Sequence, residues 1–214
     1  MHTSVPGPSP TERVMVFIDG SNVFWASRAR GLYIDYVKLT NLLVGTNRRL
    51  VRPYFYCAVG VPPKESQIRF YDKLKYSGFT VITKSLRRRV SKARLVAVFD
   101  SNNQEWKETK TNDLAKVEKD EEKGVDVALV TDMLSMAYKN AYDTAILVGG
   151  DEDYLSTVEN IKLIPRRVEV AAFSDTDTHD PPQWVSTICR NMIMAADHFY
   201  HLEKLTNQIK LVKI

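Results

Sequence analysis

The chain of 214 residues and 24.4 kDa is the size of one domain, and it can bury a hydrophobic core without disulfide bonds or a structural metal. Hydrophobic residues make up 44% and charged residues 26%, and the net charge is +4, which excludes disordered, collagen-like and mucin-like classes. No apolar run is long enough to span a bilayer, so we expect no membrane segment.

Residues 1–12 carry three prolines and lack the basic head and apolar stretch of a secretory signal, so they predict a disordered tail. Short apolar runs rich in β-branched and aromatic residues then predict buried strands over 14–18, 51–60, 79–83, 144–150 and 168–173. Helices are predicted between and after them, directly after the loop 19–22 and over 35–43, 62–78, 125–141, 154–163 and 182–202. This alternation predicts an α/β fold with a parallel sheet covered on both faces.

The alternation is interrupted by an insertion over about 84–123. Within it, the sequences RRRV and RLVAV predict a hairpin that turns at Ser91-Lys92. Residues 102–123 are so polar that we expect a solvated, mobile excursion. The remainder of 13–202 is expected to form one domain, followed by a C-terminal extension over 203–214.

Acidic residues follow two of the predicted strands. Asp19 ends the first strand, and Asp151 and Asp153 come directly after the strand 144–150. The carboxyl ends of parallel strands open onto one edge of the sheet, so these side chains are expected to face one crevice. Asp126 begins a helix, and helix starts ordinarily lie near the opposite edge. Asp126 can join the other aspartates only if the preceding insertion brings the start of its helix to the carboxyl edge of the sheet.

Asp132 lies on the same helical stripe as Val125, Leu129 and Met136, which places a carboxylate on an apolar face. A buried carboxylate is costly unless a cation or several hydrogen-bond donors face it. Two interpretations are open: a group that orients a metal, and a carboxylate that caps a backbone loop.

Clustered carboxylates predict a divalent cation. Two of them about 4 Å apart repel by about 4 kcal/mol at an effective dielectric constant of about 20, and a cation removes that repulsion. Mg²⁺ prefers carboxylates, water and phosphate oxygens, whereas the two cysteines, Cys57 and Cys189, lack zinc spacing and are expected to be buried thiols in a reducing cytoplasm. The predicted chemistry is hydrolysis of a phosphodiester by a metal-bound water.

Three segments, FIDGSNVFW, KGVDVALVTDML and LVGGDEDYLSTV, resemble the signature blocks of the LabA-like NYN family of PIN-like ribonuclease domains. The resemblance covers about Val14 to Leu202, although the polar segment 102–123 is longer than in a minimal member. It implies a three-layer α/β sandwich with a mostly parallel sheet of order 3-2-1-4-5, here with a basic hairpin and a polar insertion added. It also implies cleavage of RNA, single-stranded or structured, with Mg²⁺ or Mn²⁺ as cofactor.

The same resemblance implies roles for single residues. Asp19, Asp126, Asp151 and Asp153 correspond to metal ligands. Asn22 corresponds to a residue that orients Asp19 or contacts substrate, and Asp132 to a further catalytic carboxylate. Ser21, in the same loop, is predicted to contact the nucleic acid.

Basic residues form a second cluster. Six cations within eleven residues have no acid between them and, on a hairpin, would form a stripe suited to tracking phosphates: Lys84, Arg87, Arg88, Arg89, Lys92 and Arg94. Four more arginines could extend it: Arg28, Arg30, Arg48 and Arg49. The alternative is a solvated edge protected from strand pairing by charge. Trp25 and Trp106 are candidates for stacking on bases, although Trp25 fits better in the core.

Other catalytic arrangements lack support. Ser21 and Ser174 have no evident histidine and acid partners, and His198 and His201, at the end of the last predicted helix, suit surface or capping roles. Asp175 and Asp177 suit a solvated loop.

Two classes of function therefore stay open: a metal-dependent nuclease, and a binding module of the same fold that holds RNA or protein with little or no cleavage. The sequence does not separate RNA from DNA, and it leaves open whether the chain forms a homodimer.

Overall fold

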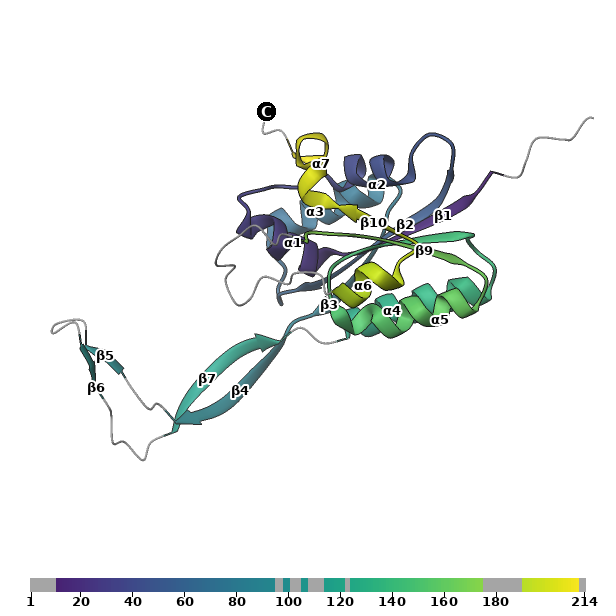
Figure 1. Cartoon of the computed structure of the whole chain (residues 1–214). Helices are drawn as coiled ribbons and strands as arrows, with labels where there is room; N and C mark the ends of the chain where they lie inside the picture. The colour runs from purple at the N-terminus through teal and green to yellow at the C-terminus, as the bar shows by residue number, and fades with distance from the viewer. Residues whose placement is uncertain are drawn as a thin grey trace, which may run out of the picture.

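A six-stranded, fully parallel sheet forms the centre of the fold, with its strands in the order β10-β9-β8-β1-β2-β3 (Figure 1). The computed structural model describes residues 11–94, 98–100, 105–107, 114–121, 124–174 and 190–211. No described helix is long and apolar enough to cross a membrane.

The elements follow one another along the chain as β1 (Arg13–Asp19), α1 (Gly20–Ala29), α2 (Tyr36–Val44), β2 (Arg49–Val59), α3 (Glu65–Tyr76), β3 (Thr80–Ser85), β4 (Arg87–Arg94), β5 (Val98–Asp100), β6 (Glu105–Lys107), β7 (Leu114–Glu121), α4 (Val125–Tyr138), β8 (Thr144–Val148), the short 3-10 helix η1 (Glu152–Tyr154), α5 (Leu155–Leu163), β9 (Arg167–Ala172), α6 (Arg190–Ala195), β10 (His198–His201) and α7 (Leu202–Ile209).

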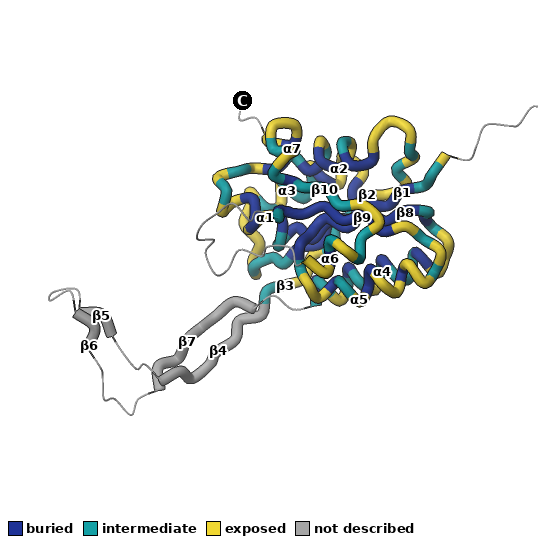
Figure 2. The backbone as a smooth tube through the Cα atoms, in the orientation of Figure 1, coloured by how far each residue is buried: buried dark blue, intermediate teal, exposed yellow. Residues whose placement is uncertain are grey.

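Helices cover both faces of the sheet because the central strand is apolar on both sides. Val16 and Ile18 of β1 belong to a core cluster with α1, α2, α3 and α7, whereas Met15 and Phe17 belong to a second cluster with α4, α5 and α6. Figure 2 shows the buried strands lying between helices that are exposed on their outer sides. Because side chains alternate along a strand, residue 19, two residues beyond Phe17, lies on the same side as Phe17, which α4 and α5 cover.

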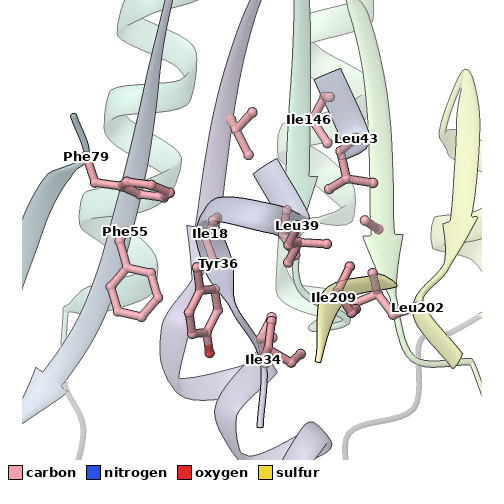
Figure 3. Close-up of a cluster of buried hydrophobic side chains, with 14 of the residues drawn as sticks. Ile18, Ile34, Tyr36, Leu39, Leu43, Phe55, Phe79, Ile146, Leu202 and Ile209 are labelled. Carbon is pink, nitrogen blue, oxygen red and sulfur yellow. The ribbon is translucent and has the colours of Figure 1, made fainter. Parts of the chain in front are cut away.

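The first cluster fixes α2 and α7 onto the sheet. Ile18 and Ile146, from the neighbouring strands β1 and β8, share one hydrophobic cluster with Leu39 of α2 and with Leu202 and Ile209 of α7 (Figure 3). All five side chains are at most 1% exposed. This packing holds β1 and β8 in register, so the loops that follow the two strands have fixed positions.

The predicted α/β fold class is confirmed. Counted along the chain, the strands of the large sheet have the order 3-2-1-4-5, with β10 added as a sixth strand beyond β9. The direction of progression reverses between β1 and β8, and crevices for ligands form at this point in open parallel sheets. Asp19 ends β1 and Gly149 follows β8, so both residues lie at the reversal.

The predicted hairpin turn at Ser91-Lys92 is wrong. Both residues lie inside β4, which pairs antiparallel with β7, opposite Val117 and Lys116. These two strands form a two-stranded sheet of their own, separate from the six-stranded sheet. The segment predicted as a polar excursion therefore contains a strand, Leu114–Glu121. Its many charged residues gave no hydrophobic pattern from which a strand could be predicted.

The prediction of one long helix over 182–202 is also wrong in its described part, because residues 190–202 divide into α6, β10 and the start of α7. The break occurs at Asp197, whose carboxylate accepts a hydrogen bond from the backbone N–H of Val168 at 2.7 Å. Its own N–H donates to the Val168 carbonyl at 2.8 Å. This double contact aligns the aromatic segment His198–His201 with β9, so it forms a strand. Residues 182–189 lie outside the described residues.

Candidate metal centre at the carboxyl edge of the sheet

Asp19 stands at the turn from β1 into α1. Its carboxylate accepts a hydrogen bond from the backbone N–H of Asn22 at 3.0 Å and so caps the helix, and the residue is only 3% exposed. The next residue has to be glycine, because a Cβ at Gly20 would lie 2.3 Å from the Phe55 ring and 2.8 Å from the Tyr56 carbonyl oxygen. The tight turn therefore fixes a buried carboxylate at the strand end.

Asn22 joins this turn to the loop after β8. Its side-chain oxygen accepts a hydrogen bond from the backbone N–H of Gly150 at 3.0 Å. A Cβ on the preceding Gly149 would come within 3.2 Å of the Cβ of Asp19, so the two loops are in close contact. The structure thus brings together the loops that carry Asp19 and Asp151, as the parallel topology predicts.

Tyr154, which the sequence analysis missed, connects Asp19 with Asp126. Its hydroxyl oxygen lies 2.8 Å from Oδ2 of Asp19 and 2.9 Å from Oδ1 of Asp126, and the residue is 1% exposed. Burial and the charges of the two carboxylates raise the pKa of Tyr154, so the hydroxyl stays protonated at neutral pH. A hydroxyl carries one proton, so it can donate to only one of its two carboxylate neighbours at a time.

Asp126 reaches this edge because α4 does not follow a strand of the large sheet. The chain arrives from β7, outside the sandwich, and passes Gly124, whose φ of 81° is left-handed, before α4 begins. The first turn of α4 is therefore free to start beside the carboxyl ends of the strands. Asp126 lies on that turn, half-buried, against Tyr154.

The other two predicted metal ligands lie in the loop after β8. The carboxylate of Asp151 accepts a hydrogen bond from the backbone N–H of Asp153 at 3.0 Å and caps η1, and Asp153 is exposed. Within the described ranges, no three His, Cys, Asp or Glu side chains are close enough together to hold a metal ion. The structure thus brings Asp19 and Asp126 together and leaves Asp151 and Asp153 beside them in the adjoining loop.

Asp132 has a role that neither interpretation anticipated. Six residues beyond Asp126 on α4, it accepts a hydrogen bond from the hydroxyl of Tyr56 at 2.9 Å. Burial and the charge of Asp132 raise the pKa of Tyr56, which keeps this hydroxyl a donor. Tyr56 is the register partner of Asp19 on β2, so the contact fixes α4 to the sheet beside the centre.

Two predictions about single residues near the centre are wrong. Trp25 does not lie in the core, because it is 59% exposed on α1. Ser174 does have partners: its hydroxyl contacts Oε1 of Glu203 at 2.6 Å and Nδ1 of His201 at 2.7 Å. Burial raises the pKa of Glu203, but hydrogen bonds from Ser174, backbone N–H groups and His201 outweigh it and hold the pKa below its usual value.

This cluster is not arranged for nucleophilic catalysis. Ser174 and Glu203 both approach Nδ1 of His201, whereas a catalytic triad places the serine and the acid on opposite ring nitrogens. The backbone N–H of Ser174 also donates to Oε2 of Glu203, at 3.3 Å. The cluster therefore ties the end of β9 to the start of α7. Asp175 and Asp177 lie outside the described residues.

The predicted nucleic-acid contacts are spread over several elements. Ser21, in the first turn of α1, accepts a hydrogen bond from the Ala58 N–H at 3.3 Å, and Lys84 is exposed near the end of β3. The other five predicted cations lie on β4, where β7 places acids in register with two of them, Glu121 opposite Arg87 and Asp120 opposite Arg88. Strand pairing thus places two acidic residues of β7 opposite the basic run of β4, which contains no acid in its own sequence.

Three of the four arginines suggested as an extension of the basic stripe are not positioned for it. Arg48 forms an ion pair with the buried Glu169 at 2.8 Å, and Arg30 lies over the Phe173 ring at 4.7 Å from its centroid. Arg49 begins β2 at the opposite edge of the sheet. Arg28 remains exposed on α1.

The chain is an α/β protein with a doubly covered parallel sheet and carboxylates at the switch point of that sheet. The chain belongs to the NYN domain family of PIN-like nucleases, whose profile matches residues 13–203. It is 25% identical over 199 residues to the low amplitude and bright protein LabA of Synechococcus elongatus, covering 92% of this chain and 88% of LabA. A Vibrio parahaemolyticus protein of unknown function, whose crystal structure is known, shares the fold with a TM-score of 0.63. That match has 19% identity and covers 96% of this chain and all of the other.

Proposed function

We propose that the chain is a metal-dependent ribonuclease that hydrolyses RNA phosphodiester bonds where Asp19 and Asp126 converge. The observation that carries the proposal is the contact of both carboxylates with one hydroxyl, that of Tyr154, at 2.8 and 2.9 Å. Membership in a nuclease family supports the same reading. Two carboxylates this close repel each other, and a cation at the same site would relieve that repulsion.

The residues present fit Mg²⁺ or Mn²⁺. The donors are the oxygens of two carboxylates, which suit a hard divalent cation. Mg²⁺ keeps several of its waters and is often held by one or two carboxylates together with substrate phosphates, so Asp19 and Asp126 form a sufficient protein contribution. In this proposal Asp151 and Asp153, in the neighbouring loop, contribute through water.

Each residue of the centre has a distinct task in this proposal. Asp19 and Asp126 hold the ion, and Tyr154 keeps the two carboxylates at a fixed separation. Asn22 holds the loop after β8 against Asp19 through the Gly150 N–H. When bound, the ion supplies an activated water and stabilises the charge that develops on phosphorus.

The second candidate is a binding module of the same fold with little or no catalysis. One observation favours it: no three potential metal ligands converge within the described part of the chain, and Asp151 is engaged as a cap. A site with two converging carboxylates can still hold Mg²⁺, which is why the nuclease is the first proposal.

The purified chain is expected to cleave a labelled single-stranded RNA with Mg²⁺ or Mn²⁺ and to stop when EDTA is added. We expect water to attack phosphorus and the O3′ to leave, which gives a 5′-phosphate and a 3′-hydroxyl. In this proposal Asp19 and Asp126 hold the metal and Tyr154 is protonated, so none of the three is a free base for the 2′-hydroxyl. Analysis of the product ends checks this. A 2′,3′-cyclic phosphate, or cleavage that ignores EDTA, would contradict the mechanism. Absence of cleavage of both RNA and DNA would favour the binding module.

The basic strand β4 is expected to contribute electrostatically to RNA binding. Replacing Arg87, Arg88 and Arg89 with alanine should weaken binding and lower the slope of log K against log salt by about 2, at roughly 0.7 per phosphate contact on a single strand. Anisotropy titrations at several salt concentrations measure the slope. A matched control removes three exposed cations from α3: Arg69, Lys73 and Lys75. Equal slopes in both triple variants would show that the acids of β7 already neutralise β4.

A further inference from the structure

The first helix leaves the metal centre carrying exposed aromatic side chains. Phe24 is 45% and Trp25 59% exposed, and their rings meet edge to face with centroids 5.2 Å apart. One turn later, the guanidinium of Arg28 lies over the ring of Tyr33, 4.2 Å from its centroid, and Tyr33 is 41% exposed. We call Phe24, Trp25, Arg28 and Tyr33 the aromatic platform.

The platform lies on and just after α1, the helix that Asp19 caps. Trp25 comes four residues after Ser21 and three after Asn22, and such residues are neighbours on a helix surface. Arg28 follows Trp25 by three residues, which continues the same strip. At about 1.5 Å of rise per residue, Trp25 lies roughly one helical turn beyond the residues that contact the loops of the centre.

The chemistry of the platform is that of a surface for nucleobases. Rings of tryptophan, phenylalanine and tyrosine stack on bases of any sequence, and an arginine beside them adds attraction for the phosphates. Residues 20–34 contain no acid, so nothing in this segment repels a phosphate backbone. Aromatic residues and arginine are also enriched in protein interfaces. The charge of the segment favours a nucleic acid, because residues 20–34 carry Arg28 and Arg30 and no acid, which suits a polyanion.

We propose that the aromatic platform stacks unpaired bases of the RNA within a few nucleotides of the bond placed at Asp19 and Asp126, and so selects single-stranded RNA. A duplex hides the faces of its bases and cannot use these rings. The cleavage part of this inference rests on the proposed function, whereas stacking itself requires no metal.

The test measures binding without catalysis. Fluorescence anisotropy in EDTA compares a labelled single-stranded RNA with the same strand in a duplex, for the full chain and for Trp25→Ala, Trp25→Phe and Tyr76→Ala. Tyr76 is a matched control, because it is 93% exposed on α3 and has no place in the platform.

Trp25→Ala is expected to weaken single-strand binding about tenfold, the loss typical of one stacked base, without changing duplex binding. Trp25→Phe should retain most of the affinity, and Tyr76→Ala all of it. Unchanged single-strand affinity in Trp25→Ala, or an equal loss for the duplex, would overturn the proposal. The proposal would also be overturned if the unmodified chain sediments as a dimer and Trp25→Ala as a monomer that still binds RNA. The rings would then form a contact between two copies of the chain.

A cleavage assay with Mg²⁺ separates this inference from the proposed function. If Trp25→Ala loses binding but the unmodified chain cuts no RNA, the platform stands and the nuclease assignment fails. If the chain cuts RNA and Trp25→Ala binds and cuts equally well, the nuclease stands and the platform fails.

Discussion

Asp19→Asn is expected to lower metal-dependent RNA cleavage by more than about a hundredfold, because even residues that only support a metal ligand commonly cost 10- to 100-fold. The fold should survive. Asparagine caps a helix as well as aspartate does, so the hydrogen bond from the Asn22 N–H to the side chain can persist. Removing one charge beside Asp126 also relieves repulsion in the metal-free protein. A labelled single-stranded RNA cleavage assay measures the loss.

Asp35→Asn is the matched control, since Asp35 caps α2 through the N–H groups of Val37 and Lys38. It should leave cleavage unchanged. Thermal melting gives an independent readout, because a cation that binds the folded state raises the melting temperature. Mg²⁺ or Mn²⁺ should stabilise the unmodified chain and Asp35→Asn but not Asp19→Asn. Full cleavage activity in Asp19→Asn would show that Asp19 is not a ligand of the catalytic metal.

Arg48→Ala is expected to lower the free energy of unfolding by about 3–5 kcal/mol, the usual cost of leaving a buried charge without its partner. Glu169 is 4% exposed in the middle of β9, and its carboxylate contacts the Arg48 guanidinium at 2.8 Å and the Tyr200 hydroxyl at 2.8 Å. For a chain of this length the melting temperature should fall by roughly 10 °C. Denaturant unfolding followed by circular dichroism measures the free energy.

Arg49→Ala is the control for this prediction, because Arg49 is the exposed neighbour of Arg48. An exposed substitution should change stability by no more than about 0.5 kcal/mol. The double variant Arg48→Met with Glu169→Leu should recover much of the loss, since it removes both charges together. If Arg48→Ala and Arg49→Ala were equally stable, the ion pair would have no role in holding β9.

The sheet could be predicted from the sequence because its strands are continuous apolar runs. Val14–Ile18 and Thr144–Val148 are buried on both faces, and such segments differ plainly from the amphipathic helices between them. The position of Asp19 followed from the same pattern, since a charge that ends a buried strand lies at the sheet edge. Parallel topology then brought the loop of Asp151 beside it.

Contacts that depend on tertiary structure could not be predicted. Tyr154 looks like an ordinary helix-start aromatic in the sequence, and only the fold shows that its hydroxyl meets Asp19 and Asp126. The strand Leu114–Glu121 has a charge pattern typical of solvated chain, and its pairing with β4 decides its structure. Trp25 follows the apolar Val23 and Phe24, yet it lies on the outer side of α1.

The position of β1 in the sheet has a consequence for protein synthesis. This strand pairs with the nearby β2 but also with β8, where Val14 lies opposite Thr144. A ribosome adding about 5–20 residues per second delivers β8 and Tyr154 many seconds after Asp19. Until then β1 lacks its neighbour β8, and Asp19 lacks its hydrogen bond from the Tyr154 hydroxyl. The nascent chain therefore cannot assemble the centre until Tyr154 and α5 have emerged from the ribosome.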